Sequence, residues 1–156
     1  MKPTGELTHL ALWVSDLDAS IEFYRKFAGM SVQTQRQEET GTRVAWISDA
    51  AQRLILVLIG PYRMPLRRRF LIALMRRIGP PSHIGVECTS RDEIRQLCDM
   101  ARAEGILRVP ATERGVSTGF IGIIADPDGN DLELSFGQNT RKYLRTETAG
   151  QPASSR

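Results

Sequence analysis

One pattern of residues occurs twice in this chain, and it constrains the fold more than any other feature. Each copy begins with a short apolar run that contains a histidine, continues with a helical pattern, and ends that helix at a glycine. His9 and Gly29 are 20 residues apart in the first copy, and His83 and Gly105 are 22 residues apart in the second. Such self-similarity predicts two modules with the same supersecondary structure.

The helical segment of each copy carries a start signal and an apolar stripe. Asp16 or Asp18 can cap the first helix, and Ser90 with Glu93 forms a capping-box pattern at the start of the second. The apolar side chains recur at helical spacing, which predicts one buried face per helix. The stripes consist of Ile21, Tyr24, Phe27 and Ala28 in the first copy and Ile94, Leu97, Cys98 and Ala101 in the second.

Three strand-like segments follow each helix, so that each module reads βαβββ. They span residues 31–38, 42–49 and 53–60, then 107–114, 118–126 and 130–137. We therefore expect an α+β fold built from two similar βαβββ modules. The expected regions are a first module (6–60), a basic linker (61–80), a second module (81–137) and a polar tail (138–156).

The composition excludes some classes of protein. No apolar run reaches the roughly 18–20 residues that span a bilayer, and no N-terminal signal region is present, so we expect a cytoplasmic protein without a membrane partner. The net charge is +3, but six arginines and no acid lie between residues 62 and 79. This local charge is weak evidence for nucleic acid, which we do not expect as a partner. The basic segment suits a solvated helix or dimer contact, a lid that contacts an anionic substrate, or a membrane or nucleic-acid patch.

Three side chains stand out as metal donors. His9 and His83 are the only histidines, and each lies early in the first strand of its module. Glu133 lies between Leu132 and Leu134, so strand alternation places its carboxylate on the opposite face from these leucines. Each residue alone could be an ordinary polar side chain. Together, two imidazoles and one carboxylate form the set that suits Fe(II), Mn(II), Ni(II) or Zn(II).

Two motifs resemble a known superfamily. HLALWVSDLDASIEFYRKFAGM (9–30) and IIADPDGNDLELSF (123–136) are similar to the opening and closing motifs of vicinal oxygen chelate proteins, over about residues 6–137. The resemblance implies that His9, His83 and Glu133 bind one divalent metal, which in turn binds two neighbouring oxygens of a small molecule. It also implies that the two modules form a curved, partly open mixed sheet around a metal-binding cavity, and that the protein is a homodimer.

Departures from individual subfamilies narrow the expected reaction. Glyoxalase I has a fourth ligand in the last strand of its first module, and the offset of 77 residues between Gly60 and Gly137 maps Glu133 onto Leu56. Extradiol dioxygenases have a tyrosine where this chain has Ile123. Fosfomycin transferases have a threonine where it has Ala11. The antibiotic-binding members lack the metal triad.

We therefore expect a glyoxalase-like metalloenzyme that acts on a small molecule with vicinal oxygens, of lyase, isomerase or dioxygenase type. Glu133 would complete the metal site and could act as a base. Side chains that we expect to line the substrate pocket are Trp13, Trp46, Leu56 and Ile123, although the tryptophans could instead pack in the core. The alternatives are a fosfomycin-type thiol transferase and a non-catalytic small-molecule-binding protein.

Overall fold

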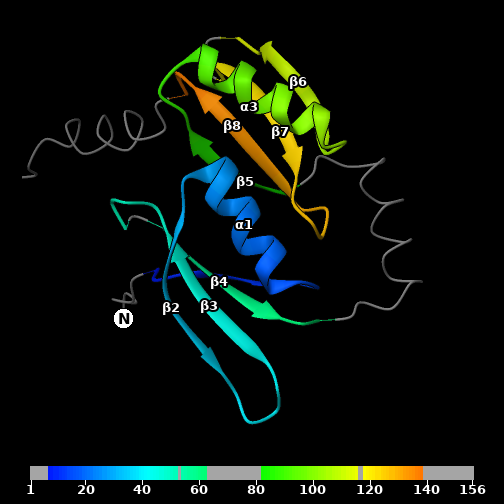
Figure 1. The fold of residues 1–156 in the computed structure, drawn as a ribbon. Coiled ribbons are helices and arrows are strands. Elements are labelled where there is room, and N and C mark those ends of the chain that lie inside the picture. The colour runs from blue at the N-terminus through cyan, green and yellow to red at the C-terminus, as the bar shows by residue number, and fades with distance from the viewer. Residues whose placement is uncertain (1–6, 53, 63–81, 116–117, 139–156) are drawn as a thin grey trace, which may run out of the picture. The chain divides into compact units, whose positions relative to one another are not determined.

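The computed structural model of the chain describes residues 7–52, 54–62, 82–115 and 118–138. Within these ranges the chain forms two successive βαβββ modules, which confirms the predicted α+β class (Figure 1). The basic segment expected within 61–80 and nearly all of the polar tail lie outside the described residues. No helix of the described ranges is long and apolar enough to cross a bilayer.

The two modules contain the same elements in the same order. The first consists of β1 (Leu10–Trp13), α1 (Leu17–Ala28), β2 (Ser31–Gln37), β3 (Arg43–Ser48) and β4 (Ile55–Gly60). The second consists of β5 (His83–Glu87), α3 (Arg91–Ala103), β6 (Leu107–Glu113), β7 (Phe120–Ala125) and β8 (Asp131–Phe136).

Each module builds a four-stranded sheet with the same topology. The strand order is β1-β4-β3-β2 in the first sheet and β5-β8-β7-β6 in the second. In the first sheet β1 pairs parallel with β4, whereas β4, β3 and β2 pair antiparallel, so the sheet is mixed as predicted. The described residues divide into two compact units: those up to His83 together with 125–131, and those of 84–124 together with those from Leu132 onward.

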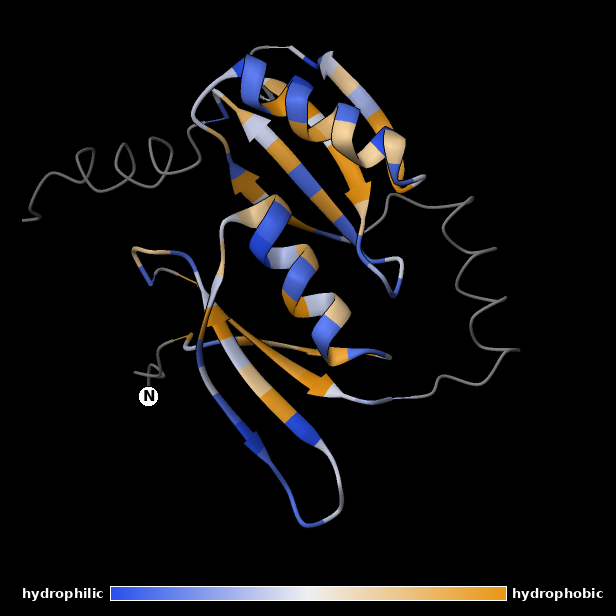
Figure 2. Cartoon of the chain, in the orientation of Figure 1, coloured by the Kyte–Doolittle hydropathy of each residue, from blue (hydrophilic) through white to orange (hydrophobic). Residues whose placement is uncertain are grey.

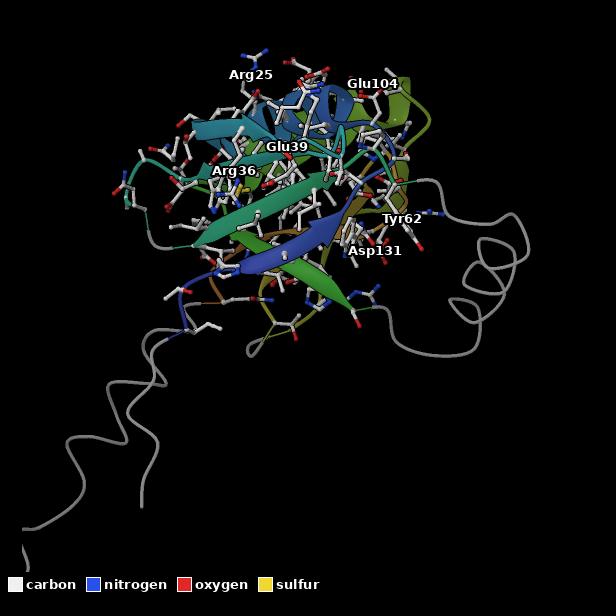
Figure 3. All side chains as sticks on the ribbon, turned by 90° about the horizontal axis from the view of Figure 1, so that it is seen from below. Arg25, Arg36, Glu39, Tyr62, Glu104 and Asp131 are labelled. Carbon is white, nitrogen blue, oxygen red and sulfur yellow. The ribbon has the colours of Figure 1, made fainter. Side chains whose placement is uncertain are left out.

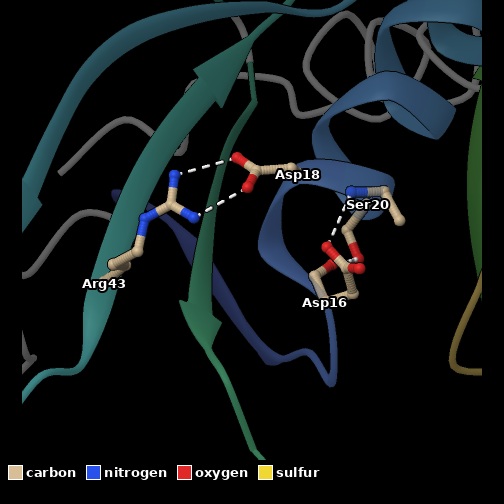
Figure 4. A network of polar contacts seen from close by, with 5 residues as sticks. Asp16, Asp18, Ser20 and Arg43 are labelled. Carbon is tan, nitrogen blue, oxygen red and sulfur yellow. Dashed lines mark hydrogen bonds and ion pairs between the residues drawn. The ribbon is translucent and has the colours of Figure 1, made fainter.

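The start of α1 is held by two aspartates with different partners. Asp16 is the N-cap, and its Oδ1 accepts from the Ala19 N–H at 3.0 Å. Asp18 accepts two hydrogen bonds of 2.8 Å from the guanidinium of Arg43, at the start of β3 (Figure 4). The Arg43 hydrogen bonds hold the pKa of Asp18 below its ordinary value. These two hydrogen bonds connect the first turn of α1 to β3 of the sheet.

The first module has an apolar core between α1 and its sheet. Phe23 and Tyr24 pack edge to face with ring centroids 5.2 Å apart. The sheet contributes side chains that alternate along β3 and β4, all at most 1% exposed: Ala45, Ile47, Leu56 and Leu58. In Figure 2, β4 is coloured largely as hydrophobic, which reflects this burial.

The start of α3 has the predicted capping box. Ser90 is the N-cap, and its Oγ accepts from the Glu93 N–H at 3.1 Å. The Glu93 carboxylate reaches back to the N–H of Thr89 at 2.7 Å and to its hydroxyl at 2.6 Å. These hydrogen bonds lower the pKa of Glu93, because they stabilise its charged form.

One face of the second sheet packs closely against α3. A Cβ added to Gly122 of β7 would lie 2.4 Å from the Cys98 Sγ of α3, so only glycine allows this approach. Phe120, two residues earlier on the same face, lies under the guanidinium of Arg91 at 5.3 Å and that of Arg95 at 5.1 Å. The opposite face of this sheet is therefore the one that α3 leaves uncovered.

Candidate metal centre

His9 lies directly before β1, the edge strand of the first sheet. Strand alternation puts its side chain on the same face as Ala11, which pairs with Val57 of β4. His9 is exposed, and the Thr8 hydroxyl oxygen lies 2.9 Å from its Nδ1. The hydroxyl can accept from Nδ1–H, and in that tautomer the Nε2 lone pair is available to a ligand.

His83 occupies the equivalent position of the second module. In the first module the Val14 N–H, five residues after His9, donates to Ile59 O at 2.9 Å. In the second module the Cys88 N–H, five residues after His83, donates to Ser135 O at 2.7 Å. Corresponding hydrogen bonds thus join the first and last strands of both modules. The two histidines are therefore structurally matched.

The same bonds correct the position that we matched to Glu133. Glu133 lies two residues before Ser135, so its counterpart lies two residues before Ile59, which is Val57. The offset of 77 residues between Gly60 and Gly137 had instead selected Leu56, the residue before Val57. Leu56 pairs with Leu10 on the opposite face from His9 and is 0% exposed. Leu56 is therefore not favoured as a pocket residue, although Val57 likewise offers no metal donor.

Aromatic side chains lie on the His9 face of the first sheet. Trp13 pairs with Ile59 across β1 and β4, and Trp46 pairs with Val57 across β3 and β4. Trp13 is 59% exposed, so it does not belong to the core. Its ring lies 5.5 Å from that of Tyr62, which is labelled in Figure 3.

A cation lies over the second tryptophan of this face. The Arg36 guanidinium is 4.9 Å from the Trp46 ring and also pairs with Glu38 at 2.9 Å. Arg36 lies near the end of β2 and is labelled in Figure 3. Arg36 was not predicted as a site residue, because an arginine among the polar residues of β2 carries no signal of its own.

His83 and Glu133 lie on one face of the second sheet. The strands β5 and β8 are neighbours, and the Ser135 Oγ lies 3.2 Å from the Glu87 Oε2, so these two side chains share a face. Alternation then puts His83 with Glu87, and Glu133 with Ser135. The leucines 132 and 134 point the other way and are 1% and 0% exposed. β8 is accordingly banded in Figure 2.

The Glu133 carboxylate is buried and specifically held. Glu133 is 6% exposed, and its Oε1 accepts from the Gln138 side-chain amide at 2.7 Å. Ile123 of β7 lies level with it, because counting back along the hairpin from the Asp126 N–H to Asn130 O bond pairs residue 123 with residue 133. Ile123 is therefore an apolar neighbour of the carboxylate.

The cysteines show no features of reactive groups. Cys88 and Cys98 are both buried free thiols. Burial raises the pKa of Cys88 to about 12, and the nearby charge of Glu93 adds to the effect. Burial also raises the pKa of Cys98. Neither thiol is therefore suited to act as a thiolate nucleophile at neutral pH.

The three predicted donors are distributed over the two sheets. His83 and Glu133 lie on neighbouring strands of the second sheet, whereas His9 lies beside β1 of the first. Among the described residues, no group of three or more His, Cys, Asp or Glu side chains is arranged to hold a metal ion. Two donors of the triad therefore share one face, and the third belongs to the other sheet.

Comparison with known proteins identifies the family. Residues 6–134 match the model of the Glyoxalase/Bleomycin resistance protein/Dioxygenase superfamily. The chain belongs to this superfamily. It is 33% identical over 145 residues to an uncharacterized protein of Pseudomonas aeruginosa, covering 88% of this chain and 91% of that protein. It is 29% identical over 133 residues to a probable lactoylglutathione lyase of Vibrio cholerae, covering 82% and 88%.

Solved structures of the glyoxalase superfamily share this fold. The trypanothione-dependent glyoxalase I of Leishmania major superimposes with a TM-score of 0.64 at 18% identity, covering 94% of this chain and 96% of that chain. A mutant of the fosfomycin resistance protein FosX from Listeria monocytogenes, complexed with Mn(II) and a dihydroxypropylphosphonic acid, has a TM-score of 0.63 at 18% identity, with coverages of 92% and 99%. A glyoxalase I and a fosfomycin resistance protein thus both share the fold of this chain.

Proposed function

We propose that this chain is a glyoxalase-like enzyme that binds one divalent metal ion through His9, His83 and Glu133. The observation that carries the proposal is the pairing of His83 and Glu133 on one face of the second sheet, with the carboxylate buried. A carboxylate in an apolar strand is costly unless it is paired, hydrogen-bonded or bound to a metal. His9 occupies the matched position of the first module and is the third donor.

The donor set indicates which metals and substrates to consider. Two imidazoles and one carboxylate suit Fe(II), Mn(II), Ni(II) or Zn(II). A bound ion of this kind polarises neighbouring oxygens of a substrate and stabilises developing negative charge on them. Since Val57 offers no fourth donor, the remaining coordination positions would be left to two substrate oxygens or water.

The protein side chains have separate roles in this proposal. Glu133 is the candidate base, since it is the one carboxylate of the proposed donor set. Trp13, Trp46, Val57 and Ile123 are the candidate pocket residues; Val57 replaces Leu56 in this set. Flat aromatic and apolar walls exclude water and favour a compact organic substrate.

The lyase type of reaction has the better support among relatives. The Vibrio cholerae relative is named as a probable lactoylglutathione lyase. We therefore propose formation of lactoylglutathione as the first activity to assay. A thiol adduct of fosfomycin would instead favour the transferase alternative, and dioxygen uptake with an iron-loaded protein would favour a dioxygenase. Recovery of a tightly bound ligand unchanged would favour a binding protein.

We further propose that the chain functions as a homodimer and that 6–60 and 81–137 are its two modules. Support for both comes from membership of the superfamily. Light scattering at several protein concentrations measures the assembly. A monomer at all concentrations would contradict the first part of this proposal.

Metal titration tests the proposed site directly. Purified protein stripped with a chelator is titrated calorimetrically with Mn(II), Fe(II), Ni(II) and Zn(II). We expect one ion per chain for at least one metal, and loss of that binding in His9→Ala, His83→Ala and Glu133→Ala. Glu113→Ala is the matched control, since this exposed glutamate of β6 pairs with Arg91 at 2.8 Å. No stoichiometric binding, or unchanged binding by the triad variants, would disprove the site.

A further inference from the structure

Gln138 contacts a residue that an extended chain would place far from it. Five residues separate it from Glu133, and an extended strand covers about 16 Å over that length. Yet the Gln138 Nε2 lies 2.7 Å from the Glu133 Oε1. Gly137 has φ +84°, a left-handed conformation that favours glycine. The chain therefore turns sharply after β8 and returns the Gln138 side chain to the strand.

A second carboxylate holds this turn in place. Glu87 at the end of β5 accepts from the Gly137 N–H with its Oε1 at 2.8 Å. Its Oε2 lies 3.2 Å from the Ser135 hydroxyl, which also lies 3.2 Å from Val86 O. Glu87 thus contacts the residues on either side of Phe136, through the Ser135 side chain and the Gly137 backbone N–H. Gly137 directly precedes Gln138. The end of β8 is fixed to β5 at the point from which Gln138 emerges.

We propose that Gln138 is a positioning residue that orients the Glu133 carboxylate, and that Glu87 acts through it by anchoring the turn. The inference rests on the proposed metal site and names two residues that hold one of its donors. An ionised carboxylate only accepts hydrogen bonds, so the amide N–H of Gln138 is the donor. Fixing one oxygen restricts rotation of the carboxylate, which lowers the entropy lost when it binds a cation.

The test removes the amide donor while keeping the side-chain volume. Gln138→Met is compared with Gln96→Met, the same substitution at an exposed position of α3, on the other face of the sheet. Both are titrated with the metal that the wild-type protein binds. We expect about a 10- to 100-fold weaker affinity for Gln138→Met, the range typical of lost hydrogen-bond partners of metal ligands. Gln96→Met should bind as the wild type does.

A double-mutant cycle tests the role of Glu87. Glu87→Ala should also weaken metal binding, but adding it to Gln138→Met should cause little further loss, because Glu87 acts through Gln138. Visible absorption of the Co(II)-loaded proteins gives an independent readout, since it reports the ligand geometry. We expect altered spectra in both single variants and an unchanged spectrum in Gln96→Met. Fully additive losses would overturn the assigned role of Glu87.

The outcomes separate this inference from the proposed function. If the wild type binds metal and Gln138→Met has the same affinity and Co(II) spectrum, the positioning role is wrong and the metal site stands. If the wild type binds none of the four metals, the site itself is wrong and the positioning role falls with it. Should Gln138→Met fold poorly by circular dichroism, Glu87→Ala decides, since unchanged affinity and spectrum in that variant would also refute the inference.

Discussion

Tyr24 joins two parts of the first unit that are far apart in sequence. Its hydroxyl donates to the Asp126 Oδ2 at 3.0 Å, and the two residues are 1% and 3% exposed. Asp126 also accepts from the N–H groups of Asp128 and Asn130 and from the Asn130 side chain. Burial raises the pKa of Asp126, while the bonds from Asn130 and Tyr24 oppose that rise. The turn at residues 125–131 is therefore bonded to α1.

Tyr24→Phe should remove one buried hydrogen bond without opening a large cavity. We expect a loss of about 1–2 kcal/mol in the free energy of unfolding, measured by urea denaturation, because the Asp126 oxygen loses a partner. Tyr62→Phe is the matched control: the Tyr62 ring contacts Trp13, and no described hydrogen bond involves its hydroxyl. Equal stability of Tyr24→Phe and wild type would show that the bond does not contribute.

At the residue scale, the face on which a strand side chain lies could be predicted from sequence, whereas the strand register and the turn after β8 could not. The face on which Glu133 lies follows from its neighbours Leu132 and Leu134, because the alternation of side chains between the two faces needs no information beyond the strand itself. Choosing between Leu56 and Val57 needs the register, and a shift of one residue moves a side chain to the other face. Gln138 lay in a segment expected to be a polar tail, and only the turn at Gly137 brings it to Glu133.

At the scale of elements, the stability that the N-terminal cap of α3 contributes should depend on pH. Glu93 receives hydrogen bonds from Thr89 and is held by them in its charged form, which lowers its pKa. A lowered pKa in the folded state stabilises the fold above the ordinary value of 4.5 for this group. That contribution is lost as the pH falls through the lowered folded value.

The difference in stability between wild type and Glu93→Gln should therefore depend on pH. We expect the wild type to be more stable at pH 7 and the difference to shrink toward zero at pH 3. Urea denaturation at several pH values measures it, with Glu104→Gln, beyond the other end of α3, as control. A difference that stays constant from pH 7 to pH 3 would contradict the role of the ionised carboxylate.

The elements themselves were largely predictable, and their bounds less so. The helices start where Asp16 and Ser90 can cap them, because capping is a contact over three residues. The last strand of the first module was expected over 53–60 and is found as Ile55–Gly60. Strand ends depend on hydrogen bonds to neighbouring strands, which are distant in sequence and leave no local signal.

At the scale of the molecule, metal binding should appear as thermal stability. An ion present at about 100 times its dissociation constant stabilises the folded state by about 2.7 kcal/mol. For a chain of this size that corresponds to about 5–10 °C in Tm. We expect this rise for the metal selected by titration, its reversal by a chelator, and its absence in His83→Ala. A rise of equal size in His83→Ala would place the metal elsewhere.

The predicted repeat is a property of the whole chain, and the structure shows which residues of the two modules correspond. Both modules have the same strand order, yet the position of Glu133 in the second corresponds to Val57 in the first. The repeat was visible in sequence because helix caps and histidines recur at similar spacing. The last strands, β4 and β8, have six residues each but were harder to align in sequence, since a small difference in loop length changes the offset without changing the pattern of apolar residues.

The turn between β7 and β8 has a consequence for synthesis of the protein on the ribosome. Residues 125–131 belong to the first unit, although most of the strands that they connect belong to the second. A nascent chain emerges from its N-terminus, so α1 lacks the Asp126 partner of Tyr24 until most of the second module has been translated. The N-terminal half should therefore acquire its full resistance to proteolysis only after residue 131 has left the exit tunnel.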